Sequence, residues 1–160
     1  MKLLSRLILV VFTIFVFLNI LQASQWPEDL LKKVEELKMA AKEKKDMPSS
    51  LPGIKNIGAE ELKRWMDQKK KFVLLDNRLR IDFEKEHIKG AELLTVDDLI
   101  KNPQIADKYN KEDIIVVYCN GVKCWRSPAA ALLLQHLGFK NIYWYREGIP
   151  DWIKRGYPTE

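Results

Sequence analysis

The sequence predicts an α/β fold, in which a parallel five-stranded sheet carries helices on both faces and is preceded by an N-terminal helix. Short apolar runs alternate with amphipathic stretches along residues 54–160, a pattern typical of repeated strand–helix units. The run at residues 114–118 is Ile-Ile-Val-Val-Tyr, with β-branched residues at its first four positions, as expected of a strand buried on both faces. A chain of 160 residues, 47% hydrophobic and 31% charged, fits one globular domain with extensions.

Residues 1–23 have the layout of a secretory signal peptide. Lys2 and Arg6 precede an almost wholly apolar run at residues 7–18, and Ala23 offers a small residue at a cleavage point. The apolar run is short for a bilayer-spanning helix, and an uncleaved membrane anchor is the alternative. In both cases the rest of the chain is expected in the periplasm or otherwise outside the cytoplasm, with membrane contact only if the segment stays uncleaved. The chain's two cysteines can oxidise there.

Residues 24–46 are expected to form an amphipathic helical extension, with Pro27 in its first turn. One apolar stripe at helical spacing contains Leu30, Val34, Leu37 and Ala41. Such a helix can pack on the main domain, act as a spacer from the membrane or bind a partner. Residues 47–53 are rich in Pro, Ser and Gly and are interpreted as a linker.

The predicted domain, residues 54–160, alternates strands and helices. The expected strands are residues 54–57, 72–75, 91–94, 114–118 and 141–145, and the expected helices are residues 59–69, 128–137 and a last one running through Trp152. Ligands of such sheets bind beyond the carboxyl ends of the strands. Cys119 follows directly after the strand at residues 114–118.

The charge pattern argues against nucleic-acid binding. The formal net charge is +5, but Lys2 and Arg6 lie in the signal segment, and removing them leaves +3 for the remainder. Lys and Glu are interspersed there, without a basic stripe alternating with aromatics.

The loop at residues 119–127 carries both cysteines, Cys119 and Cys124. It connects a buried strand to a helix that opens near Ser127 and Pro128. The amides and dipole of a helix N-terminus favour anions and thiolates. This arrangement suits a cysteine that attacks or carries a negatively charged group.

Residues 54–160 resemble rhodanese-like domains in four segments with the right order and spacing. They are Leu-Asp-Asn-Arg at 75–78, Glu-His-Ile-Lys-Gly-Ala at 86–91, Tyr-Cys through Arg-Ser at 118–127, and Arg-Glu-Gly-Ile with a later Gly-Tyr-Pro at 146–158. The resemblance implies a sulfurtransferase without a cofactor. Its cysteine takes sulfane sulfur from a small anion such as thiosulfate or polysulfide and passes it, as a persulfide, to a thiol or protein acceptor.

On this resemblance Cys119 is the sulfur carrier, and Arg126 belongs with it in the catalytic set. The loop expected to bind the substrate contains Asn120, Gly121, Val122, Lys123, Trp125 and Ser127. Gly121 is expected at positive φ, and Ser127 is expected to cap the helix that begins with Pro128. Asp76 and Arg78 are expected to form a supporting ion pair.

The loop departs from the family pattern. Six residues separate Cys119 from Arg126, two more than in the family's usual loop, and the added material includes Cys124 and Trp125. Cys124 can act as a resolving thiol, form a static disulfide, merely pack, or itself be the nucleophile. The mid-loop position of Cys124 favours Cys119 as nucleophile, and Trp125 is placed to form a wall of the pocket.

Several alternatives are less favoured. His87 is expected to be a structural, hydrogen-bonded residue rather than a metal ligand or base, and His136 a residue complementing a helix C-terminus. No metal site is expected from the Cys and His spacing. A thiol–disulfide or sulfur-relay protein and a non-catalytic binding module remain open alternatives. A phosphatase is disfavoured because the loop is too long and lacks an acidic residue.

Overall fold

The computed structural model describes residues 26–160 and confirms the predicted α/β class. The predicted signal segment, residues 1–23, lies outside the described residues. Five parallel strands form one sheet in the order β1-β5-β4-β2-β3. The strands are β1 (Lys55–Asn56), β2 (Val73–Asp76), β3 (Glu92–Leu93), β4 (Ile114–Tyr118) and β5 (Asn141–Tyr145).

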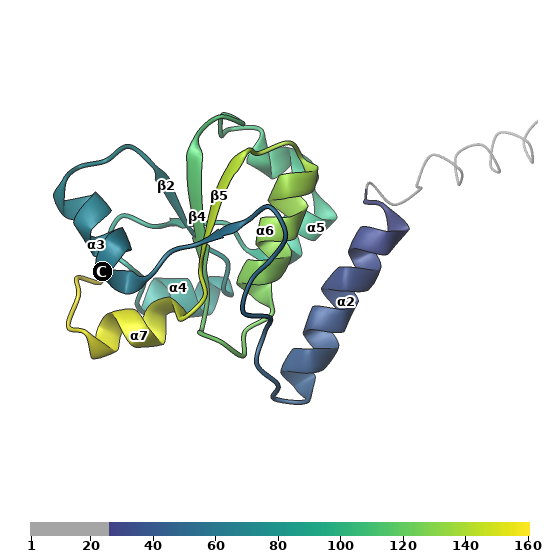
Figure 1. Ribbon diagram of the computed structural model, residues 1–160, viewed down its shortest axis with the longest axis horizontal. Helices are drawn as coiled ribbons and strands as arrows, with labels where there is room; N and C mark the ends of the chain where they lie inside the picture. The colour runs from purple at the N-terminus through teal and green to yellow at the C-terminus, as the bar shows by residue number, and fades with distance from the viewer. Residues whose placement is uncertain (1–25) are drawn as a thin grey trace, which may run out of the picture.

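Helices cover both faces of this sheet (Figure 1). They are α2 (Glu28–Lys42), α3 (Ala59–Asp67), α4 (Arg80–Lys85), α5 (Val96–Lys101), the 3₁₀ turn η1 (Pro103–Ala106), α6 (Arg126–His136) and α7 (Gly148–Lys154). Helices α2, α5 and α6 share one apolar cluster, and α3 and α7 share the other. Within residues 26–160, no helix is long and apolar enough to cross a membrane.

The central strand β4 divides the two clusters. Ile115 and Val117 face the cluster with α6, whereas Val116 and Tyr118 face the one with α3 and α7. All four side chains are fully buried. Their alternation follows from the two-residue side-chain period of a strand, so the next residue, Cys119, points toward α6.

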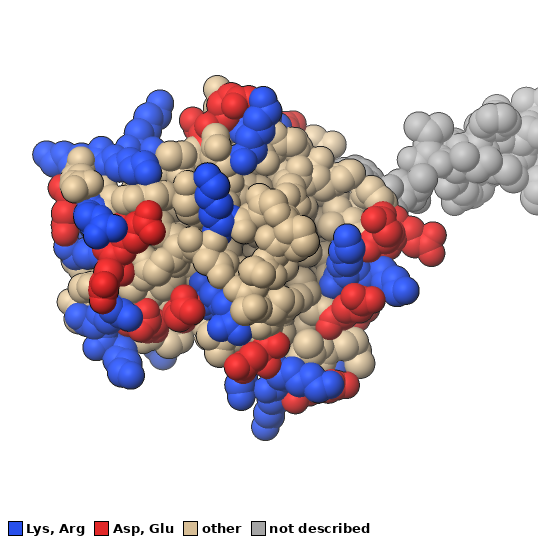
Figure 2. Space-filling model, in the orientation of Figure 1, with Lys and Arg blue, Asp and Glu red and all other residues tan. Residues whose placement is uncertain are grey.

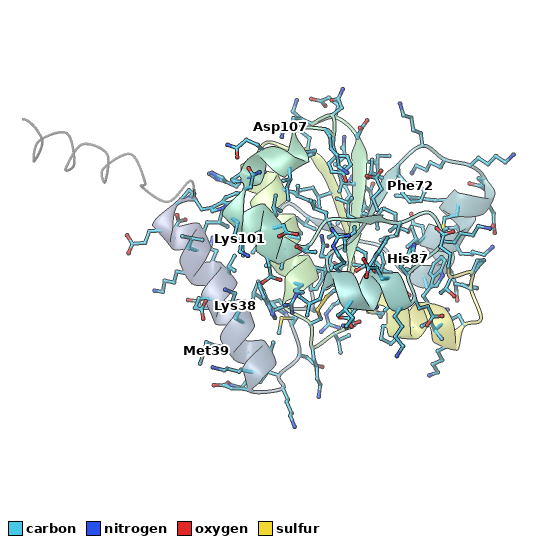
Figure 3. The ribbon with its side chains drawn as sticks, turned by 180° about the vertical axis from the view of Figure 1, so that it is seen from behind. Lys38, Met39, Phe72, His87, Lys101 and Asp107 are labelled. Carbon is cyan, nitrogen blue, oxygen red and sulfur yellow. A yellow bond between two sulfur atoms is a disulfide. The ribbon has the colours of Figure 1, made fainter. Side chains whose placement is uncertain are left out.

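The helical extension packs on the domain. Leu30, Val34 and Leu37 of α2 are buried, as the predicted stripe requires, and Ala41 is partly buried. The indole of Trp26 donates a 2.8 Å hydrogen bond to the carbonyl of Ile100 in α5. Figure 3 shows the molecule from behind, with α2 running beside α5 and Lys38 labelled on α2.

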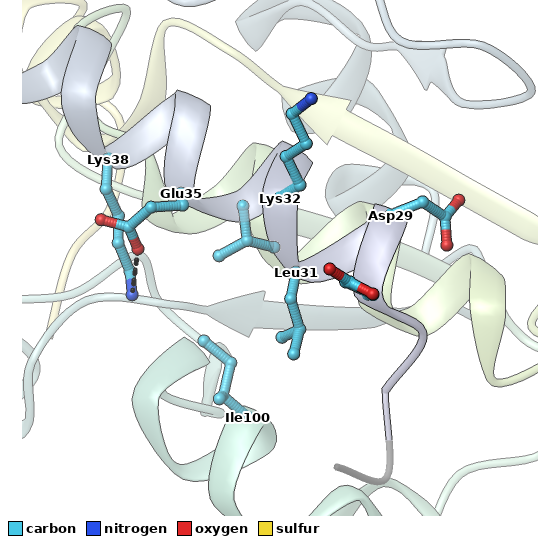
Figure 4. A pocket seen from close by; sticks show the side chains of 8 residues that line it. Asp29, Leu31, Lys32, Glu35, Lys38 and Ile100 are labelled. Carbon is cyan, nitrogen blue, oxygen red and sulfur yellow. Dashed lines mark ion pairs between the residues drawn. The ribbon is translucent and has the colours of Figure 1, made fainter.

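A groove with a volume of about 920 Å³ runs along α2. Leu31 of α2 and Ile100 of α5 face each other across it, and Lys38 and Glu35 form a 3.3 Å ion pair at one end (Figure 4). Its described lining comes from α2 and Ile100. No residue of the cysteine loop, residues 119–127, is among this lining.

Helices α4 and α5 and the 3₁₀ turn η1 are each six residues or shorter and were not predicted from the sequence. Helix α5 nevertheless has a local signal, because Thr95 Oγ1 accepts a 3.0 Å hydrogen bond from the Asp98 amide. This is the N-cap geometry expected of a Thr three residues before an acidic residue.

Candidate active site

Cys119 lies immediately after β4, as predicted, with 1% of its surface exposed. Its Sγ lies 3.0 Å from Ser127 Oγ and 3.4 Å from the Ser127 backbone nitrogen. Ser127 is the second residue of α6. The sulfur therefore meets an amide of the first turn, where the helix dipole favours negative charge.

The predicted capping role of Ser127 is wrong. Helix α6 begins at Arg126, and Trp125 occupies its N-cap position. The Ser127 hydroxyl accepts a 2.9 Å hydrogen bond from Trp144 Nε1 and faces Cys119 instead. Pro128 is the third helical residue, which is tolerated because amides of the first turn lack an intrahelical acceptor.

The two cysteines are joined by a disulfide, Cys119–Cys124, with a Cα–Cα distance of 6.3 Å. Cys119 is buried and Cys124 is partly exposed. Between them, the Cys124 amide donates a 2.9 Å bond to the Gly121 carbonyl. Gly121 has φ +96°, the positive φ predicted from the sequence.

Gly148 holds the backbone of the cysteine loop from the other side. It is the first residue of α7, and the next amide, of Ile149, donates a 3.0 Å bond to the Cys119 carbonyl. A Cβ at Gly148 would lie 2.7 Å from the Gly121 nitrogen and closer still to the Cys119 carbonyl oxygen. Gly148 belongs to the Arg-Glu-Gly-Ile segment of the family resemblance, but this role was not predicted from the sequence.

The predicted Asp76–Arg78 ion pair is present and almost completely buried, at 2.7 Å. Arg78 also donates to the Glu86 carbonyl at 2.6 Å and to Asn120 Oδ1 at 3.4 Å. Burial alone lowers the pKa of Arg78, but the hydrogen bond and the charge of Asp76 outweigh it and raise the pKa. The pair thus ties the residue after Cys119 to the end of β2.

Tyr118, on the opposite face of β4 from Cys119, completes this buried network. Its hydroxyl accepts a 3.1 Å bond from the Ile88 amide. Burial, and then the charge of Asp76, raise the pKa of Tyr118, so it stays a neutral phenol.

Arg126 has a partner outside the loop. Its guanidinium forms a 3.2 Å ion pair with Asp97 of α5. The Arg126 Cζ also lies 5.0 Å from the centre of the Trp125 ring, and the Lys38 amine lies 5.0 Å from the same ring. Trp125 therefore has two cations near its ring, and Asp97 offsets the charge of Arg126.

The remaining loop residues border the surface. Asn120 and Lys123 are exposed, and Val122 is half-buried. They line a shallow cavity of about 470 Å³ together with Gly121 and residues of α7. Lys123 is the loop cation on this open side.

Asn77 is a buried residue whose role was not predicted from the sequence. Its Nδ2 donates a 2.8 Å bond to the Leu94 carbonyl. Of the buried side-chain polar atoms in residues 26–160, Asn77 Oδ1 is the one that lacks a hydrogen-bond partner. Its side chain shares the face of Cys119, because the two residues continue the register Asp76↔Tyr118.

The histidines are structural, as expected. His87 Nδ1 lies 2.8 Å from the Phe83 carbonyl, and its ring stacks on Phe83 at 3.7 Å. His136, the exposed last residue of α6, contacts the ring of Trp26. In the part of the chain that the structure describes, no group of three or more Cys, His, Asp or Glu is placed to hold a metal ion.

The chain belongs to the rhodanese-like domain family, whose model matches residues 58–155. This places it in a sulfurtransferase family. The match begins after the extension and the predicted linker, and it includes the whole cysteine loop.

Two curated relatives carry sulfurtransferase names. The thiosulfate sulfurtransferase GlpE of Coxiella burnetii is 32% identical, over 61% of this chain and 87% of the relative. The probable adenylyltransferase/sulfurtransferase MoeZ of Mycobacterium tuberculosis is 31% identical over 64% of this chain. The alignment spans only 25% of the length of MoeZ.

A solved structure supports the fold independently. The crystal structure of the Alr3790 protein from Anabaena matches with a TM-score of 0.58 and 30% identity. The match covers 65% of this chain and 90% of that one.

Proposed function

We propose that this protein is a sulfurtransferase in which Cys119 carries sulfane sulfur as a persulfide. The observation that carries the proposal is the position of Cys119 Sγ, at the end of β4 and 3.4 Å from the Ser127 amide in the first turn of α6. That amide and the helix dipole favour a thiolate and, one bond further out, a persulfide anion. Membership of a family with sulfurtransferase relatives supports the same chemistry.

The first half-reaction starts from the reduced pair. The Cys119 thiolate attacks the outer sulfur of thiosulfate, the sulfur–sulfur bond of the donor breaks, and sulfite leaves with the bonding electron pair. The product is the Cys119 persulfide anion. Lys123, exposed on the open side of the loop, supplies positive charge for an anionic donor, whereas Asp97 offsets Arg126.

A second candidate function is a thiol–disulfide redox or sulfur-relay protein that uses both cysteines. The disulfide Cys119–Cys124 favours this second function, because the bond shows that Cys124 reaches the carrier sulfur. The Cys124 thiolate attacks Cys119 Sγ, the disulfide forms, and hydrosulfide leaves. An external dithiol must then supply two electrons and two protons to restore both thiols.

Intact-mass analysis separates these functions. The protein is reduced, treated with thiosulfate or polysulfide, and weighed as wild type, Cys119→Ser and Cys124→Ser. Transfer through Cys119 predicts the added mass of sulfur in wild type and its loss in Cys119→Ser. The relay predicts loss of two hydrogens and release of sulfide in wild type, with sulfur retained in Cys124→Ser.

Sulfur retained in Cys119→Ser but lost in Cys124→Ser would make Cys124 the carrier and reject the proposal. A protein that takes up no sulfur in any variant, while staying folded, would instead be a binding module.

We also propose export, on the layout of residues 1–23. Cell fractionation with N-terminal sequencing tests this. A mature start near residue 24 in the extracytoplasmic fraction supports it, and an intact chain in the cytoplasm rejects it.

A further inference from the structure

Residues 26–48, here called the arm, comprise Trp26, Pro27, α2 and the six residues that follow α2. The arm lies before the part of the chain that matches the family, residues 58–155. Its end reaches the cysteine loop, where the Met47 amide donates a 2.7 Å hydrogen bond to the Val122 carbonyl. Val122 lies inside the ring closed by the disulfide, between Cys119 and Cys124. The arm therefore contacts the loop between its two cysteines.

Arg146 fixes the end of the arm in place. Its Nη2 donates a 2.7 Å bond to the Met47 carbonyl, and its Nε donates a 2.9 Å bond to the Pro48 carbonyl. The Met47 side chain is 2% exposed and belongs to the apolar cluster that includes α6. Arg146 follows β5 directly. This segment, expected to be a linker, is thus held by side-chain and backbone bonds to the domain.

A second contact joins the arm to the loop on the other side of Cys124. The amine of Lys38 in α2 lies 5.0 Å from the centre of the Trp125 ring, within the range of a cation–π contact. Trp125 follows Cys124 directly in the chain. Val122 and Trp125, on either side of Cys124, therefore both rest on the arm.

We propose that the arm is a positioning element that keeps Cys124 within disulfide reach of Cys119 after the bond is reduced. A loop opened by reduction gains conformational freedom, and that freedom lowers the effective concentration of one thiol near the other. The contacts of the arm at Val122 and Trp125 restrict this conformational freedom. The cysteine loop is two residues longer than the usual loop of the rhodanese-like family. The arm contacts this longer loop at Val122 and Trp125.

This inference requires only that Cys119 and Cys124 interconvert between dithiol and disulfide, and it is independent of sulfur transfer. With glutathione as reductant, the disulfide and two glutathione thiols give two protein thiols and one glutathione disulfide. Coupling between two sites is reciprocal. If the arm favours the disulfide, closing the disulfide must therefore stabilise the arm by the same factor.

The first test measures the equilibrium constant of the pair against glutathione. We compare wild type with the double variant Lys38→Ala/Arg146→Ala, which removes the Lys38–Trp125 contact and the two Arg146 bonds that hold the end of the arm. The matched control is Lys63→Ala/Arg155→Ala. Lys63 lies 5.9 Å from the Tyr157 ring, and Arg155 pairs with Glu60 and Asp151, away from the arm.

In the arm variant, the equilibrium constant for forming the disulfide is expected to fall roughly tenfold. A change of this size is typical for the loss of one or two hydrogen bonds. Tenfold corresponds to a reduction potential about 30 mV less negative. The control variant should keep the wild-type constant. A folded arm variant that also keeps the wild-type constant overturns the proposal.

The second test uses wild-type protein and does not depend on the variant folding. Hydrogen exchange at the Met47 amide is measured in the oxidised and the reduced protein. Exchange is expected to be several-fold faster after reduction, because the reduced loop holds the Val122 carbonyl less firmly. Equal exchange in both redox states overturns the proposal.

Discussion

Ser127 Oγ lies 3.0 Å from Cys119 Sγ and is at the same time the acceptor of the Trp144 indole at 2.9 Å. Because the indole can only donate, the serine oxygen accepts from it and its own hydrogen is free to point at the sulfur. Trp144 is almost completely buried. The position of the hydroxyl is therefore determined by β5, a strand adjacent to β4.

Ser127→Ala removes this donor and leaves the Trp144 N–H buried without its acceptor. We expect reduced Cys119, studied in a Cys124→Ser background, to be alkylated by iodoacetamide roughly tenfold more slowly at neutral pH, since a hydrogen bond to a charged group contributes ~1.5–3 kcal/mol. The pH midpoint of alkylation should move upward. An unchanged alkylation profile in a folded variant would show that the hydroxyl serves only to bind the indole.

Gly148→Ala should be strongly destabilising, because a Cβ there overlaps the carbonyl of Cys119. Its φ of +60° adds backbone strain for any L-residue. We expect a loss of about 3 kcal/mol or more in the free energy of unfolding, measured with urea.

Gly138→Ala is the matched control for Gly148→Ala. Its φ is +89°, but a Cβ there would meet nothing within 4 Å among the described residues. It should lose only about 1–2 kcal/mol, from the backbone strain alone. Equal losses in the two variants would mean that the approach of Gly148 to Cys119 does not matter.

The sequence predicted β4 and β5 to the residue, since each is a dense β-branched or aromatic run whose burial depends on local pattern. It also placed Cys119 correctly, because a strand end followed by a loop is a local feature. The start of α6 was misplaced by two residues, as Ser127 and Pro128 carry strong capping signals that Trp144 overrides through a tertiary contact.

The environment of the site was harder to predict, since it depends on residues distant in the sequence. Asp97, the partner of Arg126, precedes it by 29 positions and lies on α5, a helix too short to show periodicity. The bond from Met47 to Val122 likewise depends on how α2 docks. The surface charges were predicted to be mixed, and Figure 2 shows Lys and Arg interspersed with Asp and Glu on the face drawn.

Stability at alkaline pH should depend on Tyr109. Its hydroxyl donates a 2.9 Å bond to Glu92, and burial raises its pKa from 10.0 to about 12. The folded protein keeps this proton to higher pH than the unfolded chain. The stabilisation is thus complete below pH 10 and is lost as the pH rises toward about 12.

Tyr109→Phe should therefore show a shallower fall in unfolding free energy over this pH range, measured by urea titration. Burial also raises the pKa of Tyr118 and Tyr145, so both proteins should still lose stability. If the free energy of unfolding falls with pH in parallel for the variant and wild type, the loss of stability does not come from Tyr109.

Asp97→Asn should increase the rate of sulfur transfer from thiosulfate. Arg126 is 3.2 Å from Asp97, so its charge is largely offset at the loop, and the amide leaves the guanidinium free to attract a dianion. We expect a several-fold faster first half-reaction at low ionic strength, with the gain shrinking as salt is added. The control is Asp107→Asn, which removes the same charge beside Lys111. Figure 3 shows Asp107 away from Lys38, the residue of α2 that contacts Trp125 of the cysteine loop. If both variants change the rate equally, the gain comes from net charge, and Arg126 has no particular part in donor binding.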